Sequence, residues 1–307
     1  MEIRQLEALV GIADNRSFST TAEALETVQS NISTRIARLE AELGAVLVHR
    51  GSGELTEAGI LAVARARRII DDVRAIATDV ISLEDDIRGH VAVGMIGTTG
   101  RWLIPILLKE QRVQYPHIQI RIVEGTNSTL EPQLANGKLD LAILSQPIDS
   151  SDLTDEDLFT EDLVLVVARD HPLALLRTPL QLSDIAEFDL LLPSQGTALR
   201  AEIENAATAA SIRLRPLIEI DGIRTLASLA FDGHGAAILP ATALSSHLRG
   251  AFVAIPISDL SQRRVALVNR RYGFPSTPVR AIRSLLVTLT TTSSELPSGV
   301  HIHLPQG

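Results

Sequence analysis

The chain has 307 residues, of which 45% are hydrophobic and 21% charged, and its formal net charge is -9. This composition is typical of a globular protein, and no apolar run approaches the roughly 18 residues that a membrane span needs. The start, Met1-Glu2-Ile3-Arg4, is not a secretory signal, so we expect a cytoplasmic protein with no membrane partner. Because the chain has no cysteine, a disulfide framework and a thiolate nucleophile are excluded.

A short helix is predicted over about Thr20 to Glu26, opened by a possible capping box of Thr20 and Glu23. Small Ala22, with Leu25, faces the next helix and allows a close, steep crossing. This pattern is typical of a helix-turn-helix. It equally fits a helical hairpin with no DNA role, and the pattern alone leaves both interpretations open.

The second helix, roughly Gln29 to Glu42, has one apolar and one polar face. The apolar stripe repeats at helical spacing through Ile32, Ile36, Leu39 and Leu43. Amide and hydroxyl side chains and two arginines occupy the other faces, and such groups read base edges in the major groove. The DNA-binding candidates are Gln29, Ser30, Asn31, Ser33, Thr34, Arg35 and Arg38, joined by Arg50 further on.

Charge gives this interpretation limited support. Residues 1–90 hold ten Arg, no Lys and fifteen Asp plus Glu, which is the opposite of the usual basic footprint. Residues 27–39, however, contain no acidic side chain. Few phosphate contacts are then available, so we expect weak nonspecific binding and dependence on a dimer.

The next segment has a heptad pattern of apolar residues. Steps of four and three connect Ala62, Ala66, Ile69, Val73, Ile76, Val80, Leu83 and Ile87. A sustained pattern of this kind favours a coiled-coil dimer over a helix that packs only on its own domain. We therefore predict dimerisation through Ile69, Val73, Ile76, Val80 and Leu83. Gly89 is the natural stop, which divides the chain into 1–59, 60–88 and 90–307.

After this boundary, short apolar runs alternate with helical stretches. The predicted strands cover 90–96, 118–123, 139–144, 163–168, 190–192 and 217–220. The predicted helices include 102–114, 129–135, 199–210 and 225–231. This alternation indicates an α/β fold with largely parallel sheets, and the remaining length is enough for two lobes.

Ligands of such folds bind where strands end and helices begin. Three corners qualify: Thr98, Thr99 and Arg101 after the first strand, Ser145 and Gln146 after the third, and Ser194, Gln195, Gly196 and Thr197 in the second lobe. Singly, hydroxyls before a helix are more often caps, and for Asn127 and Ser128 we expect only a turn. Because aromatic residues make up 3% of the chain, we expect a small polar or carboxylate inducer and no cofactor.

Motifs of enzymes are absent from the sequence. It contains no Gly-x-Ser-x-Gly elbow, Walker loop or His-Glu-x-x-His pair, so we predict no catalytic residue and no enzyme. His301 and His303 on one extended strand can touch a metal. A frayed, solvated end is the preferred interpretation, so no metal site is predicted.

Landmarks along essentially the whole chain resemble one family. The N-terminal ones are Ser17-Phe18, Ala22, Leu25, Gln29, Ile32, Ser33, Leu39-Glu40, Leu43-Gly44, Leu47, Arg50 and Leu55 to Gly59. The C-terminal ones are Leu103 to Pro105, Tyr115-Pro116, Asn136 to Ile143, His171 to Leu173 and Gly233 to Pro240. Together they resemble the LysR-type transcriptional regulators.

The resemblance implies an all-α winged helix-turn-helix domain, a long linker helix, and an α/β two-lobed effector domain of periplasmic-binding-protein type. It implies crossings between lobes near Glu161 and Val268, with lobe I at about 90–161 and 268–295 and lobe II at about 162–267. It favours Thr98, Thr99 and the Ser194 to Thr197 corner as inducer contacts. The family also suggests tetramers built from two dimers, whereas the sequence indicates only the first pairing.

Departures from the family pattern affect the recognition helix and the wing. Val28 stands where a capping Ser is usual, so Thr27 is expected to cap instead, and Ser30 replaces a frequent Pro. The wing of Gly51 to Glu54 is short, and the missing cysteines exclude the thiol switch of the family's peroxide-sensing branch. The leading hypothesis is an inducer-responsive regulator that binds double-stranded DNA. The alternative is a small-molecule binding protein whose N-terminal helices serve protein contacts only.

Overall fold

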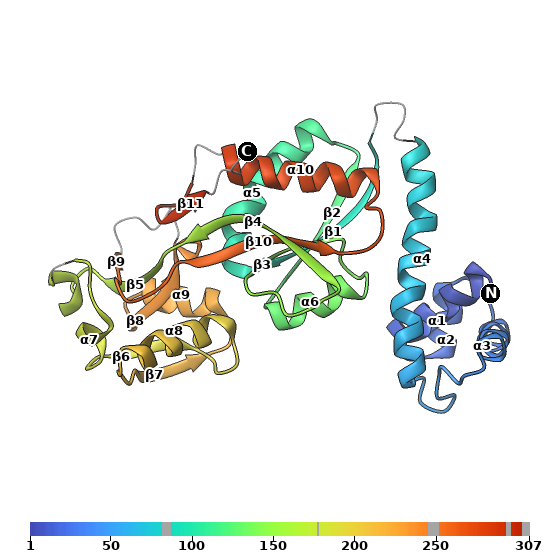
Figure 1. Cartoon of the computed structure of the whole chain (residues 1–307), viewed down its shortest axis with the longest axis horizontal. Coiled ribbons are helices and arrows are strands. Elements are labelled where there is room, and N and C mark those ends of the chain that lie inside the picture. Colours follow the sequence, from blue (N-terminus) through green and yellow to red (C-terminus); the bar gives the residue numbers. More distant parts are fainter. Residues whose placement is uncertain (82–86, 177, 245–251, 293–295, 303–307) are drawn as a thin grey trace.

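The computed structural model describes residues 1–81, 87–176, 178–244, 252–292 and 296–302. Figure 1 shows three short N-terminal helices packed against a long helix, beside an α/β part that contains two sheets. No helix within these ranges combines the length and the apolar character needed to cross a bilayer.

The N-terminal part is a small helical domain with its own core. Its helices are α1 (Ile3–Asn15), α2 (Phe18–Ala24), α3 (Gln29–Leu43) and α4 (Glu57–Ile81). Their buried apolar residues, among them Leu9, Ile12, Ile36 and Val63, form one cluster. Between α3 and α4 a short hairpin is made by the Val48–Leu55 bridge, and Gly53 turns it with a φ of 71°. This hairpin is the predicted wing.

The helix starts differ from the sequence prediction. Ser17, not Thr20, caps α2: its Oγ accepts a hydrogen bond from the Thr20 backbone N at 3.2 Å. The N-cap of α3 is Val28, with no side-chain cap bond. The Thr27 hydroxyl instead accepts a bond from Asn31 Nδ2 at 2.9 Å, so the predicted Thr27 cap is wrong. The Thr27 oxygen is thus used by a side-chain donor four residues further on, and no side chain caps α3.

Helix α4 presents apolar residues to two sides. Val63, Ala66 and Ile70 are buried in the N-terminal core, so Ala66 cannot serve the predicted intermolecular seam. Ile69, Val73, Ile76 and Val80 stay exposed in the single chain. The last residue of the predicted dimerisation set, Leu83, lies outside the described residues.

The first α/β lobe is built on a sheet of six strands in the order β11-β4-β10-β3-β1-β2. Its strands are β1 (Gly89–Ile96), β2 (Ile118–Gly125), β3 (Leu141–Ser145), β4 (Leu153–Glu161), β10 (Arg263–Arg270) and β11 (Val300–Ile302). Its helices are α5 (Gly97–Gln114), α6 (Asn127–Ala135) and α10 (Thr277–Thr292). A core that includes Leu103, Ile143 and Leu286 lies between the sheet and these helices.

The second lobe has a sheet of five strands in the order β7-β6-β8-β5-β9. The strands are β5 (Leu163–Ala168), β6 (Asp189–Pro193), β7 (Arg215–Ile220), β8 (Ala236–Pro240) and β9 (Phe252–Pro256). The helices are α7 (Leu182–Ile185), α8 (Ala198–Ala209) and α9 (Ile223–Phe231), with 3-10 turns η2 (Pro172–Leu175) and η3 (Ala241–Ala243). Separate clusters cover the two faces of this sheet.

Both sheets are mixed, which corrects the prediction of largely parallel sheets. β1 pairs in parallel with β2 and β3, but β10 pairs antiparallel with β3 and β4. In the other sheet β5 pairs antiparallel with β8 and β9, while β6 pairs in parallel with β7 and β8. The antiparallel strands are the ones that carry the chain between the lobes.

The two crossings lie side by side. β4 ends at Glu161 and β5 begins at Leu163, whereas the return strand β10 begins at Arg263, whose register partner is Glu161. Figure 1 shows β4 and β10 running together toward the second lobe. The return crossing was predicted near Val268, but Val268 lies inside β10, five residues after the start of that strand. The chain therefore returns to the first lobe earlier than predicted, just before Arg263.

The C-terminal histidine region is ordered where it is described. Val300 to Ile302 form β11 on the edge of β4, and Val300 belongs to the core of the first lobe. The His301 ring Nε2 lies 3.0 Å from Asp162 Oδ1. The predicted frayed end is thus wrong for this strand, while His303 lies outside the described residues. Among described residues no group of three or more metal-ligating side chains gathers.

Candidate DNA-binding and effector-binding sites

The recognition candidate α3 buries one face and exposes the other. Ile32, Ile36 and Leu39 are fully buried against α1 and α2, but Leu43, predicted to continue the stripe, is 47% exposed. Gln29, Ser30, Asn31, Thr34 and Arg38 are exposed, and Ser33 and Arg35 are half-buried on the flanks. The predicted polar residues therefore share one accessible surface of the helix.

Several hydrogen bonds fix parts of this surface. The Thr34 hydroxyl donates to the Ser30 carbonyl oxygen at 2.8 Å, and Asn31 is held by Thr27. Arg50 donates to Glu40 Oε2 at 3.3 Å, and Glu40 Oε1 also accepts the backbone N of Leu47 at 2.8 Å. The Arg50 charge is therefore partly neutralised by its own domain before any phosphate approaches.

The space between the lobes contains a cavity of about 410 Å³, here called the interlobe cavity. Four helices begin at its wall, with Gly97 of α5, Asn127 of α6, Ala198 of α8 and Ile223 of α9 among its lining residues. Helix N-termini carry partial positive charge and unpaired backbone N–H groups. Four of them around one cavity make a site suited to an anion.

Hydroxyl groups complete this wall. Thr98 Oγ1 is buried and has no hydrogen-bond partner among the described residues, although Thr98 lines the cavity. Thr197 also lines it and caps α8, accepting a bond from Arg200 N at 3.3 Å. Because buried polar groups rarely remain unpaired, the free Thr98 hydroxyl indicates a ligand or solvent partner.

The structure brings together three of the predicted effector contacts: Thr98, Ser145 and Thr197. Thr99 is fully buried but does not line the cavity, and Arg101 lies over the Phe231 ring, with its Cζ 5.9 Å from the ring centroid. Ser194, Gln195 and Gly196 do not line it either, although Pro193 and Thr197 on both sides of this loop do. Gln146 lines a different cavity.

Sequence reasoning missed several lining residues. Asn127, expected to form only a turn, donates from Nδ2 to the Ser145 carbonyl oxygen at 2.5 Å and lines the cavity. Arg224 of α9 pairs with Glu124 of β2 at 2.7 Å, so this ion pair joins the two lobes across the cavity. The sequence signal for these lining residues was a polar residue at the end of each strand. This signal was not sufficient, because the residues that pair with one another are far apart in the sequence.

A buried ion pair lies at the crossing between the lobes. Glu161 is fully buried: Oε2 accepts bonds from Thr242 N at 3.0 Å and Thr242 Oγ1 at 2.7 Å, and Oε1 lies 3.5 Å from Arg263 Nη1. Burial raises the pKa of Glu161, although Arg263 and the Thr242 bonds act in the opposite direction. Arg263 also lines the interlobe cavity.

Known proteins match both parts of the chain. Residues 3–60 match the model of the bacterial regulatory helix-turn-helix proteins of the lysR family, and residues 84–290 match the LysR substrate binding domain. The DNA-binding transcriptional dual regulator OxyR of Escherichia coli K12 is 30% identical over 92% of each chain.

Solved structures agree with the fold. A full-length OxyR variant from Pseudomonas aeruginosa superposes with a TM-score of 0.78 at 23% identity, covering 99% of each chain. The effector binding domain of QuiR in complex with shikimate gives a TM-score of 0.59 at 24% identity and covers 66% of this chain and 97% of that one. The chain belongs to the LysR family and is a DNA-binding transcriptional regulator with an effector-binding domain.

Proposed function

We propose that this regulator binds double-stranded DNA as a homodimer, paired further into a homotetramer, and responds in the cytoplasm to a small polar or carboxylate metabolite in the interlobe cavity. No catalytic step is part of this proposal. The observation that carries the inducer assignment is the unpaired, buried Thr98 hydroxyl in a cavity where four helices begin. Both features favour an anionic ligand that accepts hydrogen bonds.

DNA reading is assigned to the exposed side of α3, through Gln29, Ser30, Asn31, Ser33, Thr34, Arg35 and Arg38, with Arg50 at a phosphate. An inducer in the cavity changes the relative orientation of the two lobes. Through the dimer this change alters the spacing of the recognition helices, or the bend of the bound DNA. The thiol switch of the family's peroxide-sensing branch is not available to this chain, since it has no cysteine.

The DNA assignment is tested by mobility shift on fragments upstream of the protein's own and neighbouring genes, with a salt titration. Arg38→Ala is expected to weaken specific binding by about 1–3 kcal/mol if it reads a base, or to lower the salt slope by about one if it binds a phosphate. Arg213→Ala, an exposed arginine of the effector domain, is the matched control. Unchanged affinity and salt slope in Arg38→Ala would contradict the assignment.

The inducer assignment is tested by thermal-shift screening of small carboxylates on the full chain. A ligand that raises the melting temperature of the wild type is expected to bind about tenfold or more weakly to Thr98→Val, because one hydrogen bond to a charged group is lost. Ser128→Ala, a change at an exposed residue not lining the cavity, is the control. A screen in which only large apolar or aromatic ligands bind would overturn the proposal.

A further inference from the structure

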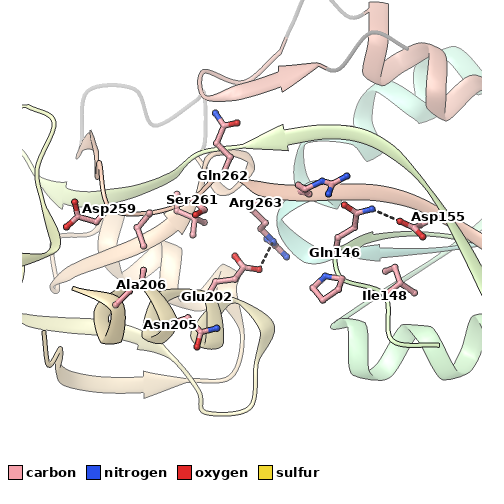
Figure 2. Close-up of a pocket in the computed structure, with 15 residues that line it drawn as sticks. Gln146, Ile148, Asp155, Glu202, Asn205, Ala206, Asp259, Ser261, Gln262 and Arg263 are labelled. Atoms are coloured by element: carbon pink, nitrogen blue, oxygen red, sulfur yellow. Dashed lines mark hydrogen bonds and ion pairs between the residues drawn. The ribbon is translucent and has the colours of Figure 1, made fainter. Parts of the chain in front are cut away.

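A second and larger cavity, of about 740 Å³, is lined by residues of both lobes next to the crossing, including Leu163 and Arg263, and is here called the hinge cavity. Figure 2 shows its walls: Glu202 and Asn205 project from α8 of one lobe, Gln146 and Asp155 belong to the other, and Arg263 projects between them. Its lining shares only Arg263 with the interlobe cavity. The two cavities are therefore distinct spaces that share one lining residue, Arg263.

Arg263 offers an unused donor to the hinge cavity. The residue is 8% exposed, and its Nε has no hydrogen-bond partner among the described residues. Its two ion pairs leave Nε without a hydrogen bond: Glu161 Oε1 pairs with Nη1 at 3.5 Å, and Glu202 Oε1 lies 4.0 Å from Nε, beyond hydrogen-bond distance. A buried guanidinium N–H without an acceptor is unfavourable, so this group is suited to a ligand oxygen.

Gln146 offers an unused acceptor to the same cavity. Its Nε2 donates to Asp155 Oδ2, which fixes the orientation of the amide because a carboxylate only accepts. The amide oxygen Oε1 is then buried with no partner among the described residues. The wall thus presents one unpaired donor and one unpaired acceptor, and they belong to different lobes.

The charge of the wall restricts the ligand further. Asp155, Glu202 and Asp259 line the cavity against Arg263 and Arg264, and Arg264 is already paired with Asp157 at 2.6 Å. This surplus of carboxylates disfavours a dianion and favours a molecule that carries a cationic donor as well as a carboxylate. Apolar contacts from Ile148, Leu163 and Leu260 accommodate a side chain.

We propose that the hinge cavity is a second small-molecule site for a free α-amino acid, whose carboxylate accepts from Arg263 Nε and whose ammonium donates to Gln146 Oε1. Because Arg263 also borders the interlobe cavity, occupancy of one site changes the affinity of the other by the same factor in both directions. This site does not depend on the inducer proposed for the interlobe cavity, and its test is independent of that inducer.

The experiment is thermal-shift screening of the full chain with the common L-amino acids, followed by calorimetry on those that raise the melting temperature. Gln146→Leu is expected to weaken binding by about tenfold or more through loss of the acceptor. Asn205→Trp changes an exposed wall residue, fills the cavity and is expected to abolish binding. Gln195→Leu makes the same change as Gln146→Leu outside both cavities and is expected to leave the affinity unchanged.

Two results would overturn the proposal. One is a screen in which no amino acid stabilises the wild type. The other is an amino acid that binds Gln146→Leu and Asn205→Trp as tightly as it binds the wild type but no longer binds Thr98→Val. Such a ligand would occupy the interlobe cavity. The unliganded melting temperature of each variant is measured first, and the exposed position of Asn205 keeps the test valid if Gln146→Leu is unstable.

Discussion

At the scale of single residues, Glu161 connects the two lobes through buried polar contacts. It is fully buried at the end of β4, where it accepts two bonds from Thr242 in the second lobe and faces Arg263 at the start of β10. Removing one partner of a buried pair leaves the other charge and the Thr242 donors unsatisfied. Such losses destabilise far more than the loss of a surface pair.

Glu161→Ala is therefore expected to lower the free energy of unfolding by about 3–5 kcal/mol, measured by urea denaturation. Asp157→Ala is the control from the same strand, because Asp157 pairs with Arg264 on the surface. That change is expected to have an effect of about 0–1 kcal/mol. Equal effects of the two substitutions would show that the Glu161 pair is not a structural joint.

The family resemblance implies a crossing near Glu161, but the sequence does not predict the role of this side chain. Its partner Arg263 is 102 residues away, so no local pattern connects them. The same reason explains Asn127, whose bond to Ser145 spans 18 residues. Thr98 and Thr197, by contrast, stand at helix starts that the local sequence shows, and the family resemblance favours them as ligand contacts over simple caps.

At the scale of elements, the exposed apolar seam on α4 is the feature that a single chain leaves unexplained. Ile69, Val73, Ile76 and Val80 are 37%, 42%, 64% and 61% exposed, and they share one side of the helix. Ile76→Asp is expected to convert the proposed dimer to a monomer, because a carboxylate would be buried without a partner in the seam. Sedimentation velocity measures this change.

Ile60→Asp is the matched control, since Ile60 is 61% exposed near the start of α4 on the opposite side of the helix. This variant is expected to remain dimeric. Specific DNA affinity is expected to fall in Ile76→Asp, because two recognition helices no longer bind as one unit. A wild type that sediments as a monomer at micromolar concentration would contradict the prediction that this seam is a dimer interface.

Prediction of elements from the sequence succeeded where the pattern is local and failed where pairing is remote. The stripe of α3 and the strands β1, β2 and β3 lie close to their predicted positions. β4 was missed, because Asp155, Glu156 and Asp157 are charged and exposed, and the strand is held by pairing with β10. Ala66 shows the converse limit: a heptad pattern does not distinguish a partner chain from the domain's own core.

At the scale of the whole molecule, the linker helix docks on the first lobe of its own chain. Asp79 Oδ1 of α4 accepts bonds from the backbone N and Oγ1 of Thr277 in α10, both at 2.7 Å. Arg68 lies 3.7 Å from Asp152 Oδ2. Arg270 Nη2 of β10 lies 4.0 Å from Asp71 Oδ2 on α4. These contacts connect the DNA-binding and effector-binding parts through charged groups.

The raised pKa of Asp71 predicts that the stability of this docked arrangement depends on pH. Burial raises its pKa from 3.8 to about 6, and nearby Asp140 adds to the shift, while Arg270, Arg74 and Arg67 oppose it. A carboxyl whose pKa is raised in the folded state stabilises that state most when it is protonated. This contribution is complete below about pH 3.8 and is lost as the pH rises through about 6.

Asp71→Asn mimics the protonated form, so it is expected to melt at a higher temperature than the wild type at neutral pH. The difference is expected to shrink as the pH falls through about 6 toward 3.8, where wild-type Asp71 is itself protonated. Asp72→Asn changes the exposed neighbouring residue, and its melting temperature is expected to depend on pH as that of the wild type does. If the difference in melting temperature between Asp71→Asn and the wild type stayed constant across this pH range, Asp71 would be hydrated. The contact between α4 and β10 would then be open in solution.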